Sequence, residues 1–441
     1  MLTGMESLRS ALIASLVLIT SLAAPAAAQP AGQQAEPPGA AGQEGAAGPD
    51  AGAPAAAPNA AAAPNAAAPA AAAPAPAPPR SEGAEAGGSA RLDHDDGFAM
   101  TSADGDFEVG IGVRTQTRLE VRKPQDQEWR SAFLIPRLRL QLAGHAFGED
   151  NTYKLEVDVG GRGELALKDF YINRLLAPNF QVRAGQWKIP FSRQEIVSDF
   201  GSELVERSIA NDWAPTGRDI GVALHNGYER SPEGLEWAVG LFNGSGARAR
   251  QEVVCADPAD ASSCAGGRPT NVPDDFEPAF VARVGWNFGR IAGYSEGDLE
   301  GGAPRFAIGA SYRADFNQFI KDPQDDPIVD HALEADFLLK VRGFDMQGAV
   351  YLLKSGDADA EVAFFAQGGI FVVRDRALVA GRFSAIPDEL DPDERLVEAL
   401  AGFDWLWSGH DLKWMTDVGI LRSGALDATL LQIRTQLQMV F

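Results

Sequence analysis

The sequence lacks any apolar segment that could cross a membrane as a helix. Its one strongly apolar run, "ALIASLVLITSLAA", is shorter than the roughly 20 residues that a spanning helix needs. The small-residue stretch "APAAAQP" follows this run, so residues 1–28 are predicted to be a secretory signal peptide cleaved after Ala28. A bundle of membrane helices is excluded, and export from the cytoplasm is indicated.

Cysteine and histidine are also scarce, with two and five residues. Cys255 and Cys264 lie close together in a loop rich in Pro, Asp and Ser, which predicts a local disulfide in an exported protein. No histidine is close to them in the sequence, so no metal site and no cofactor are expected. The segment "FNGSGA" lacks the spacing of a nucleophile elbow, and we expect no catalytic residues and no enzyme.

Residues 29–97 contain mostly Ala, Pro and Gly, with repeats such as "AAAPNAAAPAAAAPAPAPP". This composition cannot bury enough apolar surface to offset its ordering entropy, and it predicts a disordered, semi-rigid linker. Such a spacer could reach peptidoglycan. A structural tether that joins the outer membrane to the cell wall is therefore an alternative function.

The remaining chain, residues 98–441, shows alternation with a period of two. In the last segment, "LQIRTQLQMVF", the apolar residues alternate with Gln432, Arg434, Gln436 and Gln438. The segments "VGIGVRTQTRLEVR", "RLRLQL" and "RFAIGASYRADF" follow the same scheme. Each strand therefore has one apolar and one polar face.

Strands of this type must close into a barrel if their apolar face meets lipid, because lipid allows no unpaired edge. We predict an all-β fold, a transmembrane antiparallel β-barrel of about 16 strands in the bacterial outer membrane. The connections at one end are mostly short. The stretch "GRIAGYSEGDLEGGAP" belongs to that end and is too long for a simple turn.

Several segments in order, including "FLIPRLRLQLAGHAF", "NFQVRAGQWKIPFSRQEI", "GRDIGVALHNG" and "FDWLWSGHDLKW", resemble the phosphate-selective porin O and P family. The resemblance covers the whole of residues 98–441. It implies a homotrimeric water-filled porin for passive diffusion of small anions, with phosphate or polyphosphate as the substrate of the best-known members. The terminal Phe441 resembles the signal read by the barrel-insertion machinery.

The net charge of −23 opposes an anion channel at first sight. Many acids, however, lie in expected outer loops, and charges beyond a Debye length of about 8 Å are largely screened from the lumen. On the last, first and second strands, the positions that face the lumen carry arginines, which would form a basic strip along one wall. The members of this basic strip are Arg114, Arg118, Arg122, Arg137, Arg139 and Arg434. These arginines either guide anions or pair with Glu120 and Asp158 across the strands.

The insert "WKIPFSRQEIVSDFGSELVERSIANDWAPTGR" is predicted to fold inward and narrow the pore. Its candidate constriction residues are Lys188, Arg193, Arg207 and Arg218. The alternative is that Arg207 and Arg218 brace the insert by pairing with Glu203, Glu206 or Asp219.

Lysine is scarce, and Lys188, Lys340 and Lys413 are scattered, whereas phosphate-specific members of the family are associated with lysine clusters. Phosphate specificity therefore stays open. The expected partners are outer-membrane lipid, small anions and other copies of the chain, with no nucleic acid.

Overall fold

The computed structural model describes residues 89–93, 97–161, 165–244, 253–255, 264–266, 278–316, 329–356, 358–388, 390–391 and 393–441. The predicted signal peptide, His94 and most of the predicted linker lie outside these residues. Within the described part of the chain, no helix has the length and apolar character needed to cross a membrane.

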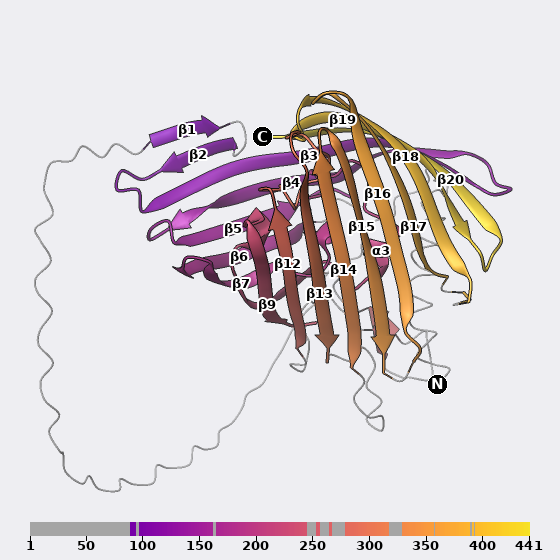
Figure 1. Cartoon of the computed structure of the whole chain (residues 1–441), viewed down its shortest axis with the longest axis horizontal. Coiled ribbons are helices and arrows are strands. Elements are labelled where there is room, and N and C mark those ends of the chain that lie inside the picture. The colour runs from indigo at the N-terminus through magenta and orange to yellow at the C-terminus, as the bar shows by residue number, and fades with distance from the viewer. Residues whose placement is uncertain are drawn as a thin grey trace, which may run out of the picture. The chain divides into compact units, whose positions relative to one another are not determined.

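The described residues form a closed antiparallel barrel of 16 strands (Figure 1). The first seven wall strands are β3 (Phe107–Pro124), β4 (Arg130–Ala146), β5 (Asn151–Asp158), β6 (Ala166–Ala177), β7 (Phe180–Lys188), β8 (Arg218–His225) and β9 (Gly234–Phe242). The other nine are β12 (Ala279–Phe288), β13 (Arg305–Asp315), β14 (Asp330–Val341), β15 (Phe344–Ser355), β16 (Glu361–Val373), β17 (Ala377–Pro387), β18 (Arg395–Ser408), β19 (Leu412–Ser423) and β20 (Ala428–Val440). Pairing of β20 with β3 closes the barrel, which confirms the predicted fold class and strand number.

The alternation of side chains places apolar residues outside and polar residues inside. In β20, Leu437 and Met439 are exposed, whereas Gln436 and Gln438 are buried. In β4, Leu140 points outward and its neighbour Arg139 is buried. Because lipid surrounds the outer surface, the exposed apolar rows are the membrane-facing surface of the barrel.

The ends of the predicted insert, residues 187–218, belong to the wall strands β7 and β8, and residues 189–217 between them fold into the barrel as an inward segment. It carries two short helices, α2 (Arg193–Ile196) and α3 (Ile209–Trp213), which Ser192 and Ser208 cap through their side-chain oxygens. The helix α3 packs against β17, far along the barrel from β7 and β8, where the insert begins and ends (Figure 1). The Ala210 N–H donates to Ser384 Oγ of β17 at 3.2 Å. The insert therefore crosses the interior from one wall to another.

A second segment, residues 289–304, also turns inward, from the end of the barrel that holds the C-terminus. Ile291 packs into a small core with Ala307 and Leu338. The Glu296 N–H donates to the Gly201 carbonyl at 2.9 Å, and the Glu203 N–H donates to Glu296 Oε2 at 3.0 Å. The stretch that is too long for a turn is thus a second inward segment that contacts the first.

In the described residues, four short strands and one 3₁₀ helix are not part of the barrel wall. They are β1 (Ser89–Asp93), β2 (Gly97–Thr101), β10 (Val253–Cys255), β11 (Cys264–Gly266) and η1 (Tyr228–Arg230). The pair β1 and β2 starts within the range assigned to the linker, and β2 pairs with the first residues of β3. Cys255 lies directly opposite Cys264 in a two-stranded sheet. Their side chains are outside the described residues, so the disulfide stays a prediction.

Candidate functional site: the inward segment and the arginine wall

The basic strip predicted from the sequence lies on three adjacent strands. Arg434 of β20 is opposite Glu120 of β3, and Arg114 of β3 is opposite Arg139 of β4. Three of its six members are nevertheless buried and the other three are partly buried, because the inward segment 189–217 covers this part of the wall. Arg118, Arg139 and Arg434 are each at most 6% exposed. The strip therefore faces the interior of the barrel but contacts protein more than water.

Two carboxylates of the inward segment bind the centre of the strip. The Arg137 guanidinium donates to both oxygens of Glu206, from Nη2 at 2.7 Å and from Nη1 at 3.4 Å. Arg118 Nη2 donates to Glu206 Oε1 at 2.5 Å. Arg139 Nη2 donates to Asp199 Oδ2 at 2.6 Å, and Arg137 Nε lies 3.5 Å from the same oxygen. Each carboxylate thus joins two guanidinium groups of the wall.

The wall arginines are oriented by further contacts with neighbouring strands. Arg118 Nε donates to Gln436 Oε1 at 3.0 Å, and Arg137 Nη1 donates to Gln116 Oε1 at 2.9 Å. Arg139 Nε donates to Asp158 Oδ2 at 2.9 Å. These second contacts come from strands of the wall, so the guanidinium groups have partners besides the inward segment.

The outer members of the strip pair with acids of the wall. Arg434 holds Asp417 through two parallel bonds of 2.7 and 2.8 Å. Arg122 pairs with Glu120, and Arg114 lies 3.8 Å from Glu156. Arg114 also lies over the ring of Phe200 on the inward segment, 5.9 Å from its centroid. The cross-strand pairing considered from the sequence therefore occurs for Asp158, which binds Arg139, whereas Glu120 pairs with arginines of its own strand.

The four constriction candidates also have partners in the structure. Lys188 donates to the carbonyls of Glu195 and Val197, at 2.6 and 2.8 Å. Arg193 binds Asp336 of β14 at 2.5 Å. These contacts hold the start of the inward segment to the wall.

Arg207 braces the segment, but through other acids than those considered from the sequence, whereas Arg218 is the first residue of β8 and pairs within the wall. Arg207 pairs with Asp199 and lies 3.5 Å from Glu195. Arg218 binds Asp169 at 2.7 Å. Glu206, one of the expected partners, instead binds Arg118 of β3 and Arg137 of β4. This pairing depends on the path of the segment through the barrel.

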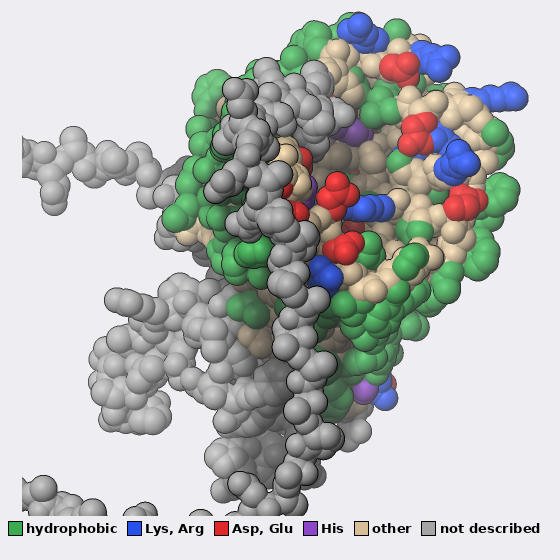
Figure 2. Space-filling view, turned by 90° about the vertical axis from the view of Figure 1, so that its left-hand side faces the viewer, with side chains coloured by type: hydrophobic (Ala, Val, Ile, Leu, Met, Phe, Trp, Pro, Cys, Tyr) green, Lys and Arg blue, Asp and Glu red, His purple; other side chains and the backbone are tan. Residues whose placement is uncertain are grey.

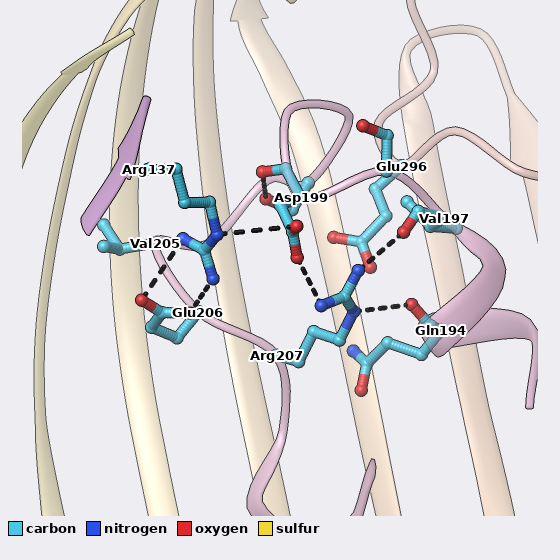
Figure 3. Close-up of a pocket in the computed structure, with 10 residues that line it drawn as sticks. Arg137, Gln194, Val197, Asp199, Val205, Glu206, Arg207 and Glu296 are labelled. Atoms are coloured by element: carbon cyan, nitrogen blue, oxygen red, sulfur yellow. Dashed lines mark hydrogen bonds and ion pairs between the residues drawn. The ribbon is translucent and has the colours of Figure 1, made fainter. Parts of the chain in front are cut away.

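A small pocket lies where the inward segment meets the wall (Figure 3). Its lining residues are Arg137, Gln194, Val197, Ser198, Asp199, Ser202, Val205, Glu206, Arg207 and Glu296. Figure 3 shows Arg137 and Arg207 approaching Asp199 from two sides. Figure 2 shows a hollow face of the barrel in which acidic and basic side chains gather inside a border of hydrophobic ones. The constriction is therefore a charged, narrow part of the lumen.

The arginines keep the two central carboxylates ionised. Burial by itself would raise the pKa of Asp199, but Arg207, Arg137 and Arg139 outweigh it and hold the pKa well below its ordinary value of 3.8. The pKa of Glu206 is also lowered, since Arg137 and Arg118 outweigh the effect of burial. At neutral pH both side chains carry a negative charge.

The contact between the two inward segments, 189–217 and 289–304, differs from the contact with the arginine wall, because a carboxyl group there has a raised pKa. Gln367 Nε2 donates to Glu203 Oε1 at 2.8 Å and to Glu296 Oε2 at 2.9 Å. A Cβ built on Gly369 would lie 2.2 Å from Glu203 Oε2 and 2.9 Å from Asp345 Oδ1, so these two carboxyl groups converge on one point. Burial, followed by the charges of Asp345 and Glu296, raises the pKa of Glu203 well above its ordinary value of 4.5.

Several residues of this site were not found from the sequence. Asp199 was not singled out, and neither was Arg382 of β17, which donates to the carbonyls of Glu206 and Arg207 at 2.8 and 2.9 Å. Arg382 had a usable signal, because it stands at an inward position of the strand "ALVAGRFSAIP". Asp199 had none, since it lies in a segment without periodicity.

The closed barrel, its apolar outer surface and its constricted charged interior define an outer-membrane porin-type channel. A family model described as "Phosphate-selective porin O and P" matches residues 107–260. This match confirms the predicted resemblance to that family over this part of the chain, and the protein is placed in the bacterial outer membrane.

Solved structures of outer-membrane channels are similar to the chain at low sequence identity. The outer membrane channel DcaP of Acinetobacter baumannii is 11% identical with a TM-score of 0.51, covering 77% of this chain and 99% of its own. The anion-selective porin from Comamonas acidovorans is 10% identical with a TM-score of 0.49, covering 76% of this chain and 99% of its own. No curated protein matches the sequence.

Proposed function

We propose that the channel conducts small anions by passive diffusion and that oxyanions such as phosphate are among its solutes. One observation carries this proposal: Arg118, Arg137 and Arg139 converge from two neighbouring strands on the constriction. There, Arg207 joins them from the inward segment. A solute that crosses the constriction must pass these guanidinium groups.

Physical chemistry favours oxyanions at such a place. Guanidinium groups bind phosphate and carboxylate oxygens through two parallel hydrogen bonds, and they stay charged at all relevant pH values. In a lumen with little competing water, each interaction exceeds its bulk-water value of about 1 kcal/mol at 4 Å. The description of the matched family as phosphate-selective supports the same class of solute.

The association state and the partners are part of the proposal. The family resemblance supports a homotrimer in outer-membrane lipid, assembled by the barrel-insertion machinery. We propose a channel without enzymatic activity.

The proposed function is tested by the reversal potential of purified protein in a planar bilayer under a KCl gradient. Wild-type protein is expected to prefer chloride over potassium, and Arg139→Gln is expected to weaken that preference. The control is Arg422→Gln, because Arg422 is exposed and pairs with Asp427 away from the constriction. A preference of the wild type for potassium would contradict the proposal.

A tether to the cell wall is a second candidate, favoured by the position of β2. This strand pairs with Phe107–Pro124 beside Phe441, whose N–H donates to the Val113 carbonyl at 3.0 Å. The chain therefore enters the barrel at the end that holds the C-terminus, which is the periplasmic end in bacterial barrels. Deletion of residues 29–90 should leave conductance intact, and loss of envelope attachment in that variant would support the tether.

A further inference from the structure

Glu206 is held in the way in which a bound oxyanion would be held. Both of its carboxylate oxygens accept bonds from the guanidinium of Arg137, and one of them also accepts a bond from Arg118. The donors belong to the rigid wall, whereas Glu206 belongs to a segment without strand structure. The same fork of donors would bind phosphate or a carboxylate of a solute.

Asp199 and Glu206 differ in how firmly they are held. The carboxylate of Asp199 is 5% exposed and pairs with Arg207 of its own segment as well as with the wall. The side chain of Glu206 is 28% exposed, and its contacts are with wall arginines. Glu206 is therefore the side chain that can leave while Asp199 keeps the segment attached.

The arginines would remain in place after Glu206 leaves. Gln436 holds Arg118 at 3.0 Å and Gln116 holds Arg137 at 2.9 Å. The vacated donors would thus stay aimed at the cavity, at no new cost in side-chain entropy.

We propose that Glu206 is an internal counter-anion of the arginine wall, and that a permeating oxyanion displaces it to bind Arg118 and Arg137. Glu206 then sets how tightly the channel holds oxyanions. It prevents a permanently bound phosphate or carboxylate from blocking the lumen, because every incoming anion competes with a tethered carboxylate. This inference rests on the proposed anion channel and deepens it.

The test compares wild type with Glu206→Gln, which keeps the size of the side chain and removes its charge. Inorganic phosphate or acetate is added to single channels that conduct KCl, and the concentration that halves the chloride current is measured for each. In Glu206→Gln, half-block is expected at an oxyanion concentration lower by about tenfold, because the uncharged amide competes for Arg118 and Arg137 less strongly than the carboxylate does. Tighter block by both anions indicates a general oxyanion site, and tighter block by phosphate alone indicates a phosphoryl site.

A matched control is Glu229→Gln. Glu229 also forms two parallel bonds with an arginine, Arg183, at 2.9 and 2.7 Å, but away from the cavity. This variant should be blocked like wild type. Glu206→Asp keeps the charge with a shorter reach, and it should shift the block in the same direction by a smaller factor if Glu206→Gln does not insert.

The two levels of the proposal fail separately. A wild type without anion preference would overturn the proposed function. An anion-selective wild type whose block is unchanged or weakened in Glu206→Gln, relative to Glu229→Gln, would overturn the role of Glu206.

Discussion

Arg137 of the barrel wall and Glu206 of the inward segment face each other with Arg137 Nη2 2.7 Å from Glu206 Oε2. The residues are 69 positions apart in the sequence. Their pairing joins the predicted basic strip and the predicted constriction into one site. The basic strip and the inward segment were predicted as two separate sites of ion contact, and they are bound to each other.

The stability of the contact between the two inward segments should fall as pH rises. The folded-state pKa of Glu203 lies above its ordinary value of 4.5, so the folded state binds more protons than the unfolded state between these two values. Stability is therefore full below about pH 4.5 and is lost as pH rises through the folded pKa. Glu203→Gln should remove this loss, as measured by thermal unfolding in detergent between pH 4 and pH 9.

Glu206 supplies a control of opposite sign for this pH dependence. Its folded pKa is lowered, so its contribution is present above pH 4.5 and is lost as pH falls. Glu206→Gln should therefore flatten the profile below pH 4.5, in a scan extended to about pH 2, and leave the alkaline side unchanged. Equal alkaline slopes in wild type and Glu203→Gln would show that Glu203 is ionised in the folded protein.

Deletion of Phe441 should impair assembly. The residue exchanges two main-chain hydrogen bonds with Val113 at the seam, of 3.0 and 2.7 Å, and its exposed ring ends the apolar row of β20. We expect periplasmic accumulation or degradation, measured as loss of the heat-modifiable band from outer-membrane fractions. Phe441→Tyr keeps the ring and should assemble. A normal heat-modifiable band in the deletion strain would contradict the prediction that the insertion machinery recognises Phe441.

The strands could be predicted from the sequence because alternation is a local property. Arg139 and Leu140 alternate between interior and exterior as the pattern requires, and Asp158 is the cross-strand neighbour of Arg139. The pairing of Arg137 with Glu206 could not be predicted in the same way, since it depends on how a non-periodic segment crosses the barrel. The second inward segment left one trace in the sequence, which was its excess length.

Replacement of both cysteines by Ser should leave insertion and conductance nearly unchanged. Cys255 and Cys264 lie in a two-stranded sheet whose pairings are confined to its own two strands, so it adds nothing to the wall. A disulfide there would constrain a loop of only about ten residues, worth at most about 3 kcal/mol to that loop. The check is conductance together with heat-modifiability, and loss of the folded barrel would show that the loop supports the scaffold.

Glu296→Ala should loosen the second inward segment and widen the lumen. Its carboxylate accepts bonds from the Glu203 N–H and from Gln367 Nε2, at 3.0 and 2.9 Å. Leaving such buried donors without an acceptor costs about 1–3 kcal/mol each. Single-channel conductance should rise with more open-channel noise. Glu300→Ala is the control, because Glu300 is on the same segment and is exposed; an equal rise in both variants would contradict a specific role for Glu296.

Charge and geometry at the arginine wall can be separated by two double variants. Arg118→Glu with Arg137→Glu changes the local charge by about four units and adds two carboxylates beside Glu206 and Asp199, so anion preference should be lost or inverted. Arg118→Lys with Arg137→Lys keeps the charge but removes the planar fork. Chloride should therefore stay preferred over potassium. Phosphate should lose its advantage over chloride, and its half-block concentration should rise by about tenfold. Reversal potentials under one KCl gradient give the anion preference, and titration of the chloride current with phosphate gives the half-block concentration. Arg183→Lys changes a bidentate arginine away from the cavity and should behave as wild type. Phosphate block that persists in the Lys variant would place oxyanion recognition elsewhere, with Arg139 and Arg207 around Asp199 as the next candidates.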